Sequence, residues 1–350
     1  MISAYSPDRP LPVHEPDFEN VLKVLRCETP DRPTLFEFFM NAPLYQRLVK
    51  HLDQPLPENH PEWLLTLRGF QAAGYDYATL GVPGFGFASD RAQEEETFSL
   101  NAGAAISDRA SFDAYEWMDP ADARYSMLDS FAEHLPRGMK LIMFGPDGIL
   151  ENVIKLIGYE NLCFMIVEDE QLVYDVFENV GSRLVEYYRR GAKHPVVGAC
   201  IDNDDWGFNT QTMLSPADMR RFVLPWHKKL VEAVHEAGKP VILHSCGYYG
   251  EVIDEVIDDL KLDGRHSYED KITPVEQAYE ELHGRIAVLG GIDVDFMCRH
   301  TPAEVNERAK RMLERTAGRG GYALGSGNSI PEYVPDEAYI AMIRAALDAG

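Results

Sequence analysis

Two side chains that can bind a metal, His244 and Cys246, stand two positions apart in the stretch KPVILHSCG, residues 239–247. The apolar run 240–243 predicts a short strand that is buried on both faces, as in a parallel sheet. Residues i and i+2 of an extended segment point to the same side, so the imidazole and the thiol are expected to share one small volume. Zinc prefers such a pair of nitrogen and sulfur donors. The structural alternative is a buried cysteine next to a histidine that ends a strand.

More polar side chains follow the other predicted strands. In a parallel barrel the catalytic groups lie at the carboxyl ends of the strands, and we therefore predict that Asp202, His266 and Glu269 are catalytic. Substrate-binding residues are predicted at the same ends: Glu37, Asp147, Asp204, Trp206, Tyr248, Gly290, Gly291, Asp293, Ser326 and Asn328. Structural alternatives stay open for several of them. The aspartates at 202–205 could only cap a helix or turn, His266 could be a core histidine, and the two glycines could only permit a tight turn.

A scaffold for these residues follows from the order of the predicted elements. Candidate strands alternate with helical patterns, which predicts an α/β protein with a single (β/α)8 TIM-type barrel. The strands are expected at 34–37, 76–80, 139–144, 195–201, 240–243, 264–266, 285–289 and 321–324. Residues 1–19 are expected to form an N-terminal arm and residues 20–350 the barrel, with 85–119 as an insertion that could act as a lid. A doubly wound open sheet is the structural rival.

The composition narrows the range of partners. The 33 basic and 57 acidic side chains give a net charge of −24, which argues against nucleic acid and anionic membrane surfaces as partners. No apolar run approaches the ~20 residues of a membrane span, and residues 1–15 lack a signal-peptide core. The five scattered cysteines favour free thiols over a disulfide framework. We therefore expect a cytoplasmic protein that acts on a small-molecule substrate.

Three motifs give the chain a family resemblance: HSCG at 244–247, LGGID at 289–293 and GYALGSGNSI at 321–330. They resemble the uroporphyrinogen decarboxylase (URO-D) superfamily, as do residues 145–146 and 214–216, and the resemblance covers about residues 30–350. It implies a distorted eight-stranded β/α barrel with a deep cleft at the carboxyl ends of the strands. True URO-D enzymes use no metal and hold a carboxylate-rich substrate with N-terminal arginines. The corresponding stretch here, EFFMN at 37–41, contains no arginine.

The chain is more similar to a second branch, the zinc-dependent methyltransferases, which move methyl groups between corrinoid proteins and thiols or folate-type acceptors. His244 and Cys246 match the first two zinc ligands of that branch. Its third ligand is a cysteine, but Asn328 stands at that position here, and asparagine is a poor zinc ligand. Asp202, His266 or Glu269 is expected to complete the site. The resemblance therefore implies zinc-assisted methyl transfer, with zinc as the cofactor and a corrinoid protein as a partner.

Two other functions stay open on the sequence alone. One is a metal-free decarboxylase or lyase for a smaller carboxylated substrate, in which His266, Asp202 and Asn328 would stabilise a carbanion or an enol-like intermediate. The other is a non-catalytic barrel that binds a corrinoid protein or a tetrapyrrole. A homodimer also stays open as the assembly.

Overall fold

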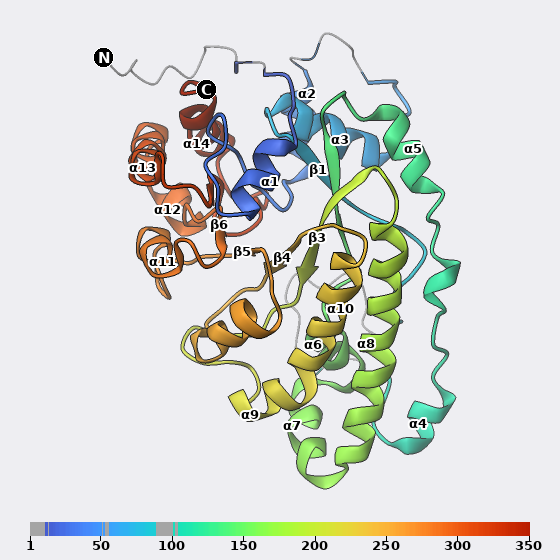
Figure 1. The fold of residues 1–350 in the computed structure, drawn as a ribbon. Helices are drawn as coiled ribbons and strands as arrows, with labels where there is room; N and C mark the ends of the chain where they lie inside the picture. The colour runs from blue at the N-terminus through green and yellow to red at the C-terminus, as the bar shows by residue number, and fades with distance from the viewer. Residues whose placement is uncertain (1–10, 13, 51, 53–55, 89–100, 102–103) are drawn as a thin grey trace.

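The centre of the protein is a parallel sheet of seven strands that follow one another in chain order (Figure 1). The computed structural model describes residues 11–12, 14–50, 52, 56–88, 101 and 104–350. The strands are β1 Tyr77–Gly81, β2 Lys140–Phe144, β3 Val197–Asn203, β4 Val241–His244, β5 Gly264–His266, β6 Ala287–Leu289 and β7 Tyr322–Ala323. All neighbouring strands pair in parallel, so their carboxyl ends lie at the same edge of the sheet.

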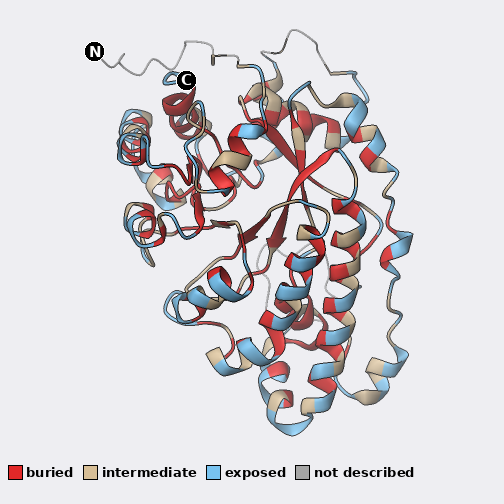
Figure 2. Cartoon of the chain, viewed as in Figure 1, coloured by how far each residue is buried: buried red, intermediate tan, exposed pale blue. Residues whose placement is uncertain are grey.

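The residues of the strands are almost all buried (Figure 2). β2 and β4 consist mainly of apolar residues, and Leu141, Ile142 and Met143 have no exposed surface. Continuous apolar runs of this kind are typical of parallel strands covered on both faces. The register places His244 at the end of β4 beside Asn203 at the end of β3 and beside His266 at the end of β5. The polar ends of these three strands are thereby brought together.

The segment predicted as the first strand, 34–37, does not form a ladder. Leu35 makes a single parallel bridge with Leu324, next to β7. On its other side the segment meets β1 through side chains, because the Tyr77 hydroxyl and the Thr79 hydroxyl donate to backbone carbonyls of residues 37 and 38. These side chains occupy the space in which a backbone ladder would form. The α/β architecture is confirmed, whereas the described residues form a seven-stranded parallel sheet and not the predicted closed ring of eight.

Helices connect the strands and cover the sheet, and α8 and α10 lie side by side along it (Figure 1). No helix among the described residues is both long enough and apolar enough to cross a membrane. The α-helices are α1 Glu19–Leu25, α2 Ala42–Val49, α3 Glu62–Ala72, α4 Arg109–Ala114, α5 Met127–His134, α6 Ile149–Ile157, α7 Tyr159–Glu168, α8 Glu170–Ala192, α9 Pro216–Asp218, α10 Leu224–His235, α11 Val275–Leu282, α12 Val294–Arg299, α13 Pro302–Thr316 and α14 Asp336–Leu347. Short 3₁₀ segments occur at Pro120–Asp122 and Gly250–Val252, and π-helical turns at Met219–Val223 and Glu255–Asp259.

The helical run from α9 to α10 carries a proline in its interior. It begins with an N-cap, because the Ser215 side chain accepts a hydrogen bond from the Asp218 N–H at 3.1 Å. Pro225 lacks an N–H, and its ring would clash with the carbonyl group four residues earlier in a regular helix. The π-helical turn Met219–Val223 widens the helix just before this proline. The helix continues as α10 and presents His227 to the end of β3.

Two predicted segments fall partly outside the described residues. Of the N-terminal arm, residues 1–10 and 13 are outside, and α1 begins at Glu19. Of the insertion 85–119, residues 89–100 and 102–103 are outside. Its described flanks pack on the core, because Phe85 stacks on Tyr187 with ring centroids 5.4 Å apart and Phe87 contacts Trp117. A role of the insertion as a lid stays a prediction.

Candidate functional site

A cavity of about 670 Å³ lies at the carboxyl ends of strands β3 to β7. It is lined by Phe39, Asp205, His244, Cys246, Tyr268, Glu269, Lys271, Asp293, Val294, Asp295, Cys298, Gly327, Asn328, Ser329, Pro331 and Tyr333. Most of the lining residues come from loops that directly follow the strands, where the active face of a parallel barrel is expected. A cavity of this size suits a small molecule.

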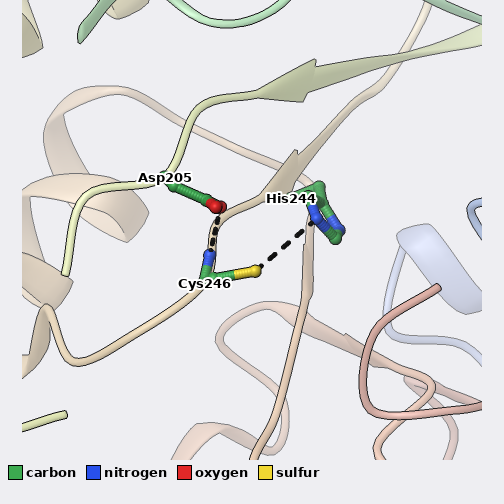
Figure 3. Close-up of side chains that lie close together, drawn as sticks. All are labelled: Asp205, His244 and Cys246. Atoms are coloured by element: carbon green, nitrogen blue, oxygen red, sulfur yellow. Dashed lines mark hydrogen bonds between the residues drawn. The ribbon is translucent and has the colours of Figure 1, made fainter. Parts of the chain in front are cut away.

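Three potential metal ligands converge in this cavity: Asp205, His244 and Cys246 (Figure 3). One ligand atom from each lies within 4.8 Å of the others, and His244 Nε2 is 3.9 Å from Cys246 Sγ. In a tetrahedral zinc site, neighbouring ligand atoms are about 3.5 Å apart. The three donors, one each of oxygen, nitrogen and sulfur, therefore fit zinc in number, type and spacing. The predicted convergence of His244 and Cys246 is confirmed.

Gly247 makes this arrangement possible, because the chain turns sharply behind Cys246. Its φ is +81°, in the left-handed region that favours glycine. A Cβ atom at this position would lie 2.0 Å from the carbonyl oxygen of Gly207. The loop after β4 can thus pack tightly against the loop after β3, which carries Asp205.

His266 fixes the orientation and the tautomer of His244. The two Nδ1 atoms are 2.7 Å apart, and His266 Nε2 is 3.3 Å from the Ser326 carbonyl oxygen. A carbonyl oxygen only accepts, so His266 carries its proton on Nε2 and accepts through Nδ1. His244 must then donate from Nδ1, which leaves the lone pair of Nε2 free on the side of Cys246. Burial lowers the pKa of His244 to about 4 and the pKa of His266 far below its ordinary value, so both rings are neutral at neutral pH.

Two hydrogen-bond donors point at the sulfur atom of Cys246. Asn328 Nδ2 lies 3.2 Å from Sγ and the Ser267 hydroxyl 3.5 Å. The Asn328 amide is held in this orientation because its Oδ1 accepts the Ser329 N–H at 2.8 Å. Ser267 has a φ of +84°, which costs a non-glycine residue roughly 1–3 kcal/mol and is typical of functional sites. Asn328 therefore faces the sulfur as a hydrogen-bond donor, at the position to which the sequence resemblance assigns a third zinc ligand.

Burial raises the pKa of the Cys246 thiol above its ordinary value, and the hydrogen bonds from Ser267 and Asn328 oppose that shift. The thiol is therefore protonated at neutral pH until a cation binds next to it. A bound cation favours the thiolate, to which both donors can then hydrogen-bond. Metal binding at this site should accordingly release a proton.

Asp205 is the third potential ligand in this group, which includes none of the residues that the sequence predicted for this position. Its Oδ1 accepts the Cys246 N–H at 2.7 Å, which ties the loop after β3 to the loop after β4. Asp202 and Asp204 turn to the opposite side of the chain and both bind His227. A signal for this existed in the sequence. Residues 202 and 204 share one side of an extended segment, so residue 205 must face the other.

Asp202 and Asp204 belong to a buried network outside the cavity. The two ring nitrogens of His227 lie 2.6 Å from an Asp202 oxygen and 2.8 Å from an Asp204 oxygen. Asp204 also accepts the N–H groups of Leu150 and Glu151, which open α6, and the indole N–H of Trp206 at 3.0 Å. Asp204 therefore stabilises the start of α6, a helix that precedes it in the chain, and does not cap the helix or turn that follows it. The network fixes the backbone from which Asp205 reaches the cavity.

Glu37 and Ser326 also lie beneath the cavity, out of contact with a ligand in it. The Ser326 hydroxyl is within hydrogen-bonding distance of both Glu37 Oε1, at 2.8 Å, and the Asn328 carbonyl. The carbonyl only accepts, so it takes the single hydroxyl proton, and the carboxyl group of Glu37 must donate to Ser326 Oγ. Burial raises the pKa of Glu37 to about 8, which agrees with a neutral carboxylic acid. Glu37 therefore supports the loop that carries Asn328.

The remaining predicted residues are dispersed. Gly290 and Gly291 form a tight turn, and a Cβ at Gly291 would lie 2.2 Å from the Val275 side chain. Asp147 is exposed and pairs with Lys155, and Tyr248 and Trp206 are absent from the cavity lining. Of the fifteen predicted site residues, the cavity brings together His244, Cys246, Glu269, Asp293 and Asn328.

Most residues at the rim of the cavity were not predicted from the sequence. Phe39, Lys271, Asp295, Cys298 and Tyr333 line the cavity although none was predicted. They stand several residues beyond a strand end or on helix α12, and nothing in the spacing of the sequence marks them. Only the folding of loops toward one another reveals their position.

Comparisons with known proteins identify the family of the chain. Residues 106–348 match the family model described as Uroporphyrinogen decarboxylase (URO-D), more than half of the chain. The chain belongs to the URO-D family. The predicted family resemblance is thereby confirmed.

Individual members of the URO-D family show how far the similarity extends. A uroporphyrinogen decarboxylase of Thermus thermophilus is 26% identical over 341 residues, which cover 91% of this chain and 94% of the relative. A uroporphyrinogen decarboxylase of a Geobacter species is 29% identical over 182 residues, and this match spans 51% of the chain and 50% of the relative, about half its length. A methyltransferase from Methanosarcina mazei superposes with a TM-score of 0.67 at 15% identity and covers 93% of this chain and 97% of that structure. At this identity the similarity concerns the fold.

Proposed function

We propose that this URO-D family member is a zinc-dependent methyltransferase that methylates a small thiol. The observation that carries the proposal is the convergence of Asp205, His244 and Cys246 on one side of a cavity, with ligand atoms within 4.8 Å of one another. Three protein ligands leave the fourth position of a tetrahedral site free for substrate, as in catalytic zinc sites. The methyl donor stays a prediction from the family resemblance, namely a corrinoid protein.

Zinc, when bound, would supply the Lewis acidity that lowers the pKa of the acceptor thiol and keeps its thiolate at neutral pH. The protein contributes orientation. His266 holds His244 so that its free Nε2 lone pair faces the site, and the Cys246 N–H holds the Asp205 carboxylate. Asn328 and Ser267 donate to the sulfur of Cys246, which would reduce the electron density that this sulfur gives to a bound zinc ion.

The atoms and electrons of the methyl transfer balance without a further cofactor. The sulfur of the acceptor forms a bond to the methyl carbon, the bond from that carbon to the donor atom breaks, and its electron pair leaves with the donor. The proton of the thiol passes to solvent through the cavity mouth, where Tyr333 is exposed. The role of the protein is to align the two partners and to exclude competing reactions.

Decarboxylation of a carboxylate-rich substrate is less compatible with this cavity. Such a substrate calls for guanidinium donors, and the described lining residues include no arginine. They include four acidic residues and one lysine, which would repel an anionic substrate.

Removal of zinc tests the proposal. We expect the protein, purified without added metal, to contain about one zinc per chain and to transfer the methyl group of methylcobalamin to a small thiol. A strong chelator is expected to lower this rate by at least about 100-fold, and added zinc to restore it. The metal content is measured by elemental analysis and the rate by the absorbance change of the corrinoid. Zinc-free protein with undiminished activity in chelator would favour a metal-free mechanism instead.

His266 offers a second prediction, on the support of a ligand. His266→Phe removes the acceptor for the Nδ1 proton of His244, and we expect the dissociation constant of zinc to rise by about 10- to 100-fold. His266→Asn retains an acceptor near the same place and is expected to recover most of this loss. Competition with a metal indicator measures both values. Equal zinc affinity of the Phe and Asn variants would contradict the role assigned to His266.

A further inference from the structure

The cavity carries an excess of negative charge. Its described lining residues include the acidic side chains of Asp205, Glu269, Asp293 and Asp295, and one basic side chain, Lys271. The net charge of the whole chain, −24, has the same sign. A low-dielectric cleft lined by charge of one sign raises the local concentration of oppositely charged ligands.

The excess persists when the metal site is loaded. The two positive charges of a divalent ion would be balanced by the carboxylate of Asp205 and the thiolate of Cys246. Asp295 pairs with Arg299 at 2.7 Å. Glu269 and Asp293 have no ion-pair partner within 4 Å in the described part of the chain, although both oxygens of Asp293 accept backbone N–H groups. Besides Asp205, which the metal would balance, Glu269 and Asp293 are therefore the two lining carboxylates that have no ion-pair partner in the described part of the chain.

Glu269 stands close to the metal ligands. Burial, together with the carboxylates of Asp293 and Asp205, raises the pKa of Glu269, whereas Lys271 and the Gly247 N–H oppose this shift. Glu269 lines the same cavity as Asp205, Cys246 and Asp293, so its carboxyl group shares this space with two other carboxylates. A cation in the cavity would relieve this repulsion, and an anion would add to it.

Aromatic side chains complete the wall. Phe39, Tyr268 and Tyr333 line the same cavity, and Phe39 and Tyr333 are 46% and 73% exposed. Aromatic faces beside carboxylates bind organic cations through their ring quadrupole.

We propose that the acceptor is a small aliphatic thiol with a positively charged group at its other end, an aminothiol, and that Glu269 is the residue that determines this specificity. The inference rests on the proposed function, because it assigns the free zinc position to the sulfur of the same molecule. The sulfur would face Asp205, His244 and Cys246, while the ammonium group would face Glu269 and the aromatic wall. Thiols that carry a sulfonate or carboxylate would meet the same groups with the wrong charge.

Three thiols of the same length test the inference, because they differ only in charge: 2-aminoethanethiol, 2-mercaptoethanol and 2-mercaptoethanesulfonate. The protein is loaded with cobalt(II) in place of zinc, and binding is followed by the thiolate-to-cobalt absorption. Two unit charges about 6 Å apart at an effective dielectric constant of about 40 change an affinity about tenfold. We expect the aminothiol to bind about tenfold more tightly than the neutral thiol and about 100-fold more tightly than the sulfonate.

Glu269→Gln is expected to reduce the ratio of aminothiol to sulfonate affinity by about tenfold or more. The ratio compares two ligands on one protein, so partial unfolding of a variant does not change it. Asp147→Asn is the matched control, because it removes one exposed carboxylate outside the cavity and should leave the ratio unchanged.

The outcomes separate this inference from the proposed function. Equal binding of all three thiols, tighter binding of the sulfonate, or an unchanged ratio in Glu269→Gln would overturn the inference alone. Failure of every thiol to alter the cobalt spectrum would overturn the proposed function as well. A preference for the aminothiol that Glu269→Gln reduces and Asp147→Asn leaves intact would support it.

Discussion

Replacement of Cys246 by alanine is expected to remove zinc from the purified protein and to abolish thiol methylation. Cys246 supplies the only sulfur among the three converging ligands, and His244 Nε2 lies 3.9 Å from it. Structural zinc sites with four ligands bind with roughly 10–16 kcal/mol, so the loss of one ligand weakens binding by about 10²- to 10³-fold. Elemental analysis and the rate of methyl transfer from methylcobalamin measure the two effects.

Cys298 provides the matched control for this experiment. It lines the same cavity but lies outside the group of converging ligands, so Cys298→Ala is expected to keep both the zinc and the activity. Stoichiometric zinc in Cys246→Ala, or an equal loss of zinc in both variants, would show that Cys246 is not a ligand. Circular dichroism of each variant excludes loss of the fold as the cause.

Asp204→Ala is expected to lower the free energy of unfolding by about 3–5 kcal/mol. The carboxylate of Asp204 accepts four hydrogen bonds: from two N–H groups at the start of α6, from the indole of Trp206 and from His227. Asp204 and His227 are fully buried, so the substitution leaves buried N–H donors without an acceptor and removes one of the two carboxylates that bind the His227 ring. Urea or guanidinium denaturation measures the change.

A substitution at the surface serves as a control for this loss of unfolding free energy. Asp258 is exposed and pairs with Arg285 at 3.3 Å, and Asp258→Ala is expected to change the free energy of unfolding by less than about 0.5 kcal/mol. A change of similar size in the two variants would argue against an energetic role of the buried network. Zinc affinity is expected to fall in Asp204→Ala alone, because Asp205 is attached to the same loop.

The same network makes stability depend on pH. Burial alone would lower the pKa of His227, but the carboxylates of Asp202 and Asp204 raise it to about 10. The unfolded value is about 6.5, so the contribution of His227 is complete below about pH 6.5 and is lost as the pH rises toward 10. The difference in unfolding free energy between the wild type and His227→Gln should therefore narrow over this range. A difference that stays constant from about pH 6 to about pH 10 would mean that His227 is neutral.

The sequence determined the central part of the site. An apolar run followed by His-Ser-Cys-Gly specifies a buried strand, two side chains on one side of its end and a sharp turn after them, and the structure has each of these features. These are local properties. The alternation of side chains along an extended backbone and the conformational freedom of Gly247 depend only on residues close in the chain. The strand order of the parallel sheet was equally accessible, because apolar runs alternated with helical patterns.

The tertiary structure decided which polar residues serve the cavity. Three similar residues, Asp202, Asp204 and Asp205, stand close together in the sequence. His227 on α10 binds the first two, whereas Asp205 faces the cavity. His266 looked catalytic, but the register of β4 and β5 puts it behind His244. These outcomes depend on contacts between segments that lie about twenty or more residues apart, and no spacing within one segment encodes them.

The incomplete eighth strand and the charge of the cavity both result from packing between segments that are distant in the sequence. Residues 34–37 have the composition of a strand, but hydroxyl groups of β1 meet their carbonyls and replace a ladder. The acidic residues of the cavity come from three separate loops, so their sum became visible only when the loops were brought together. Local sequence fixes the direction of each side chain, whereas the charge and the ligand set of a cavity arise from packing between distant segments.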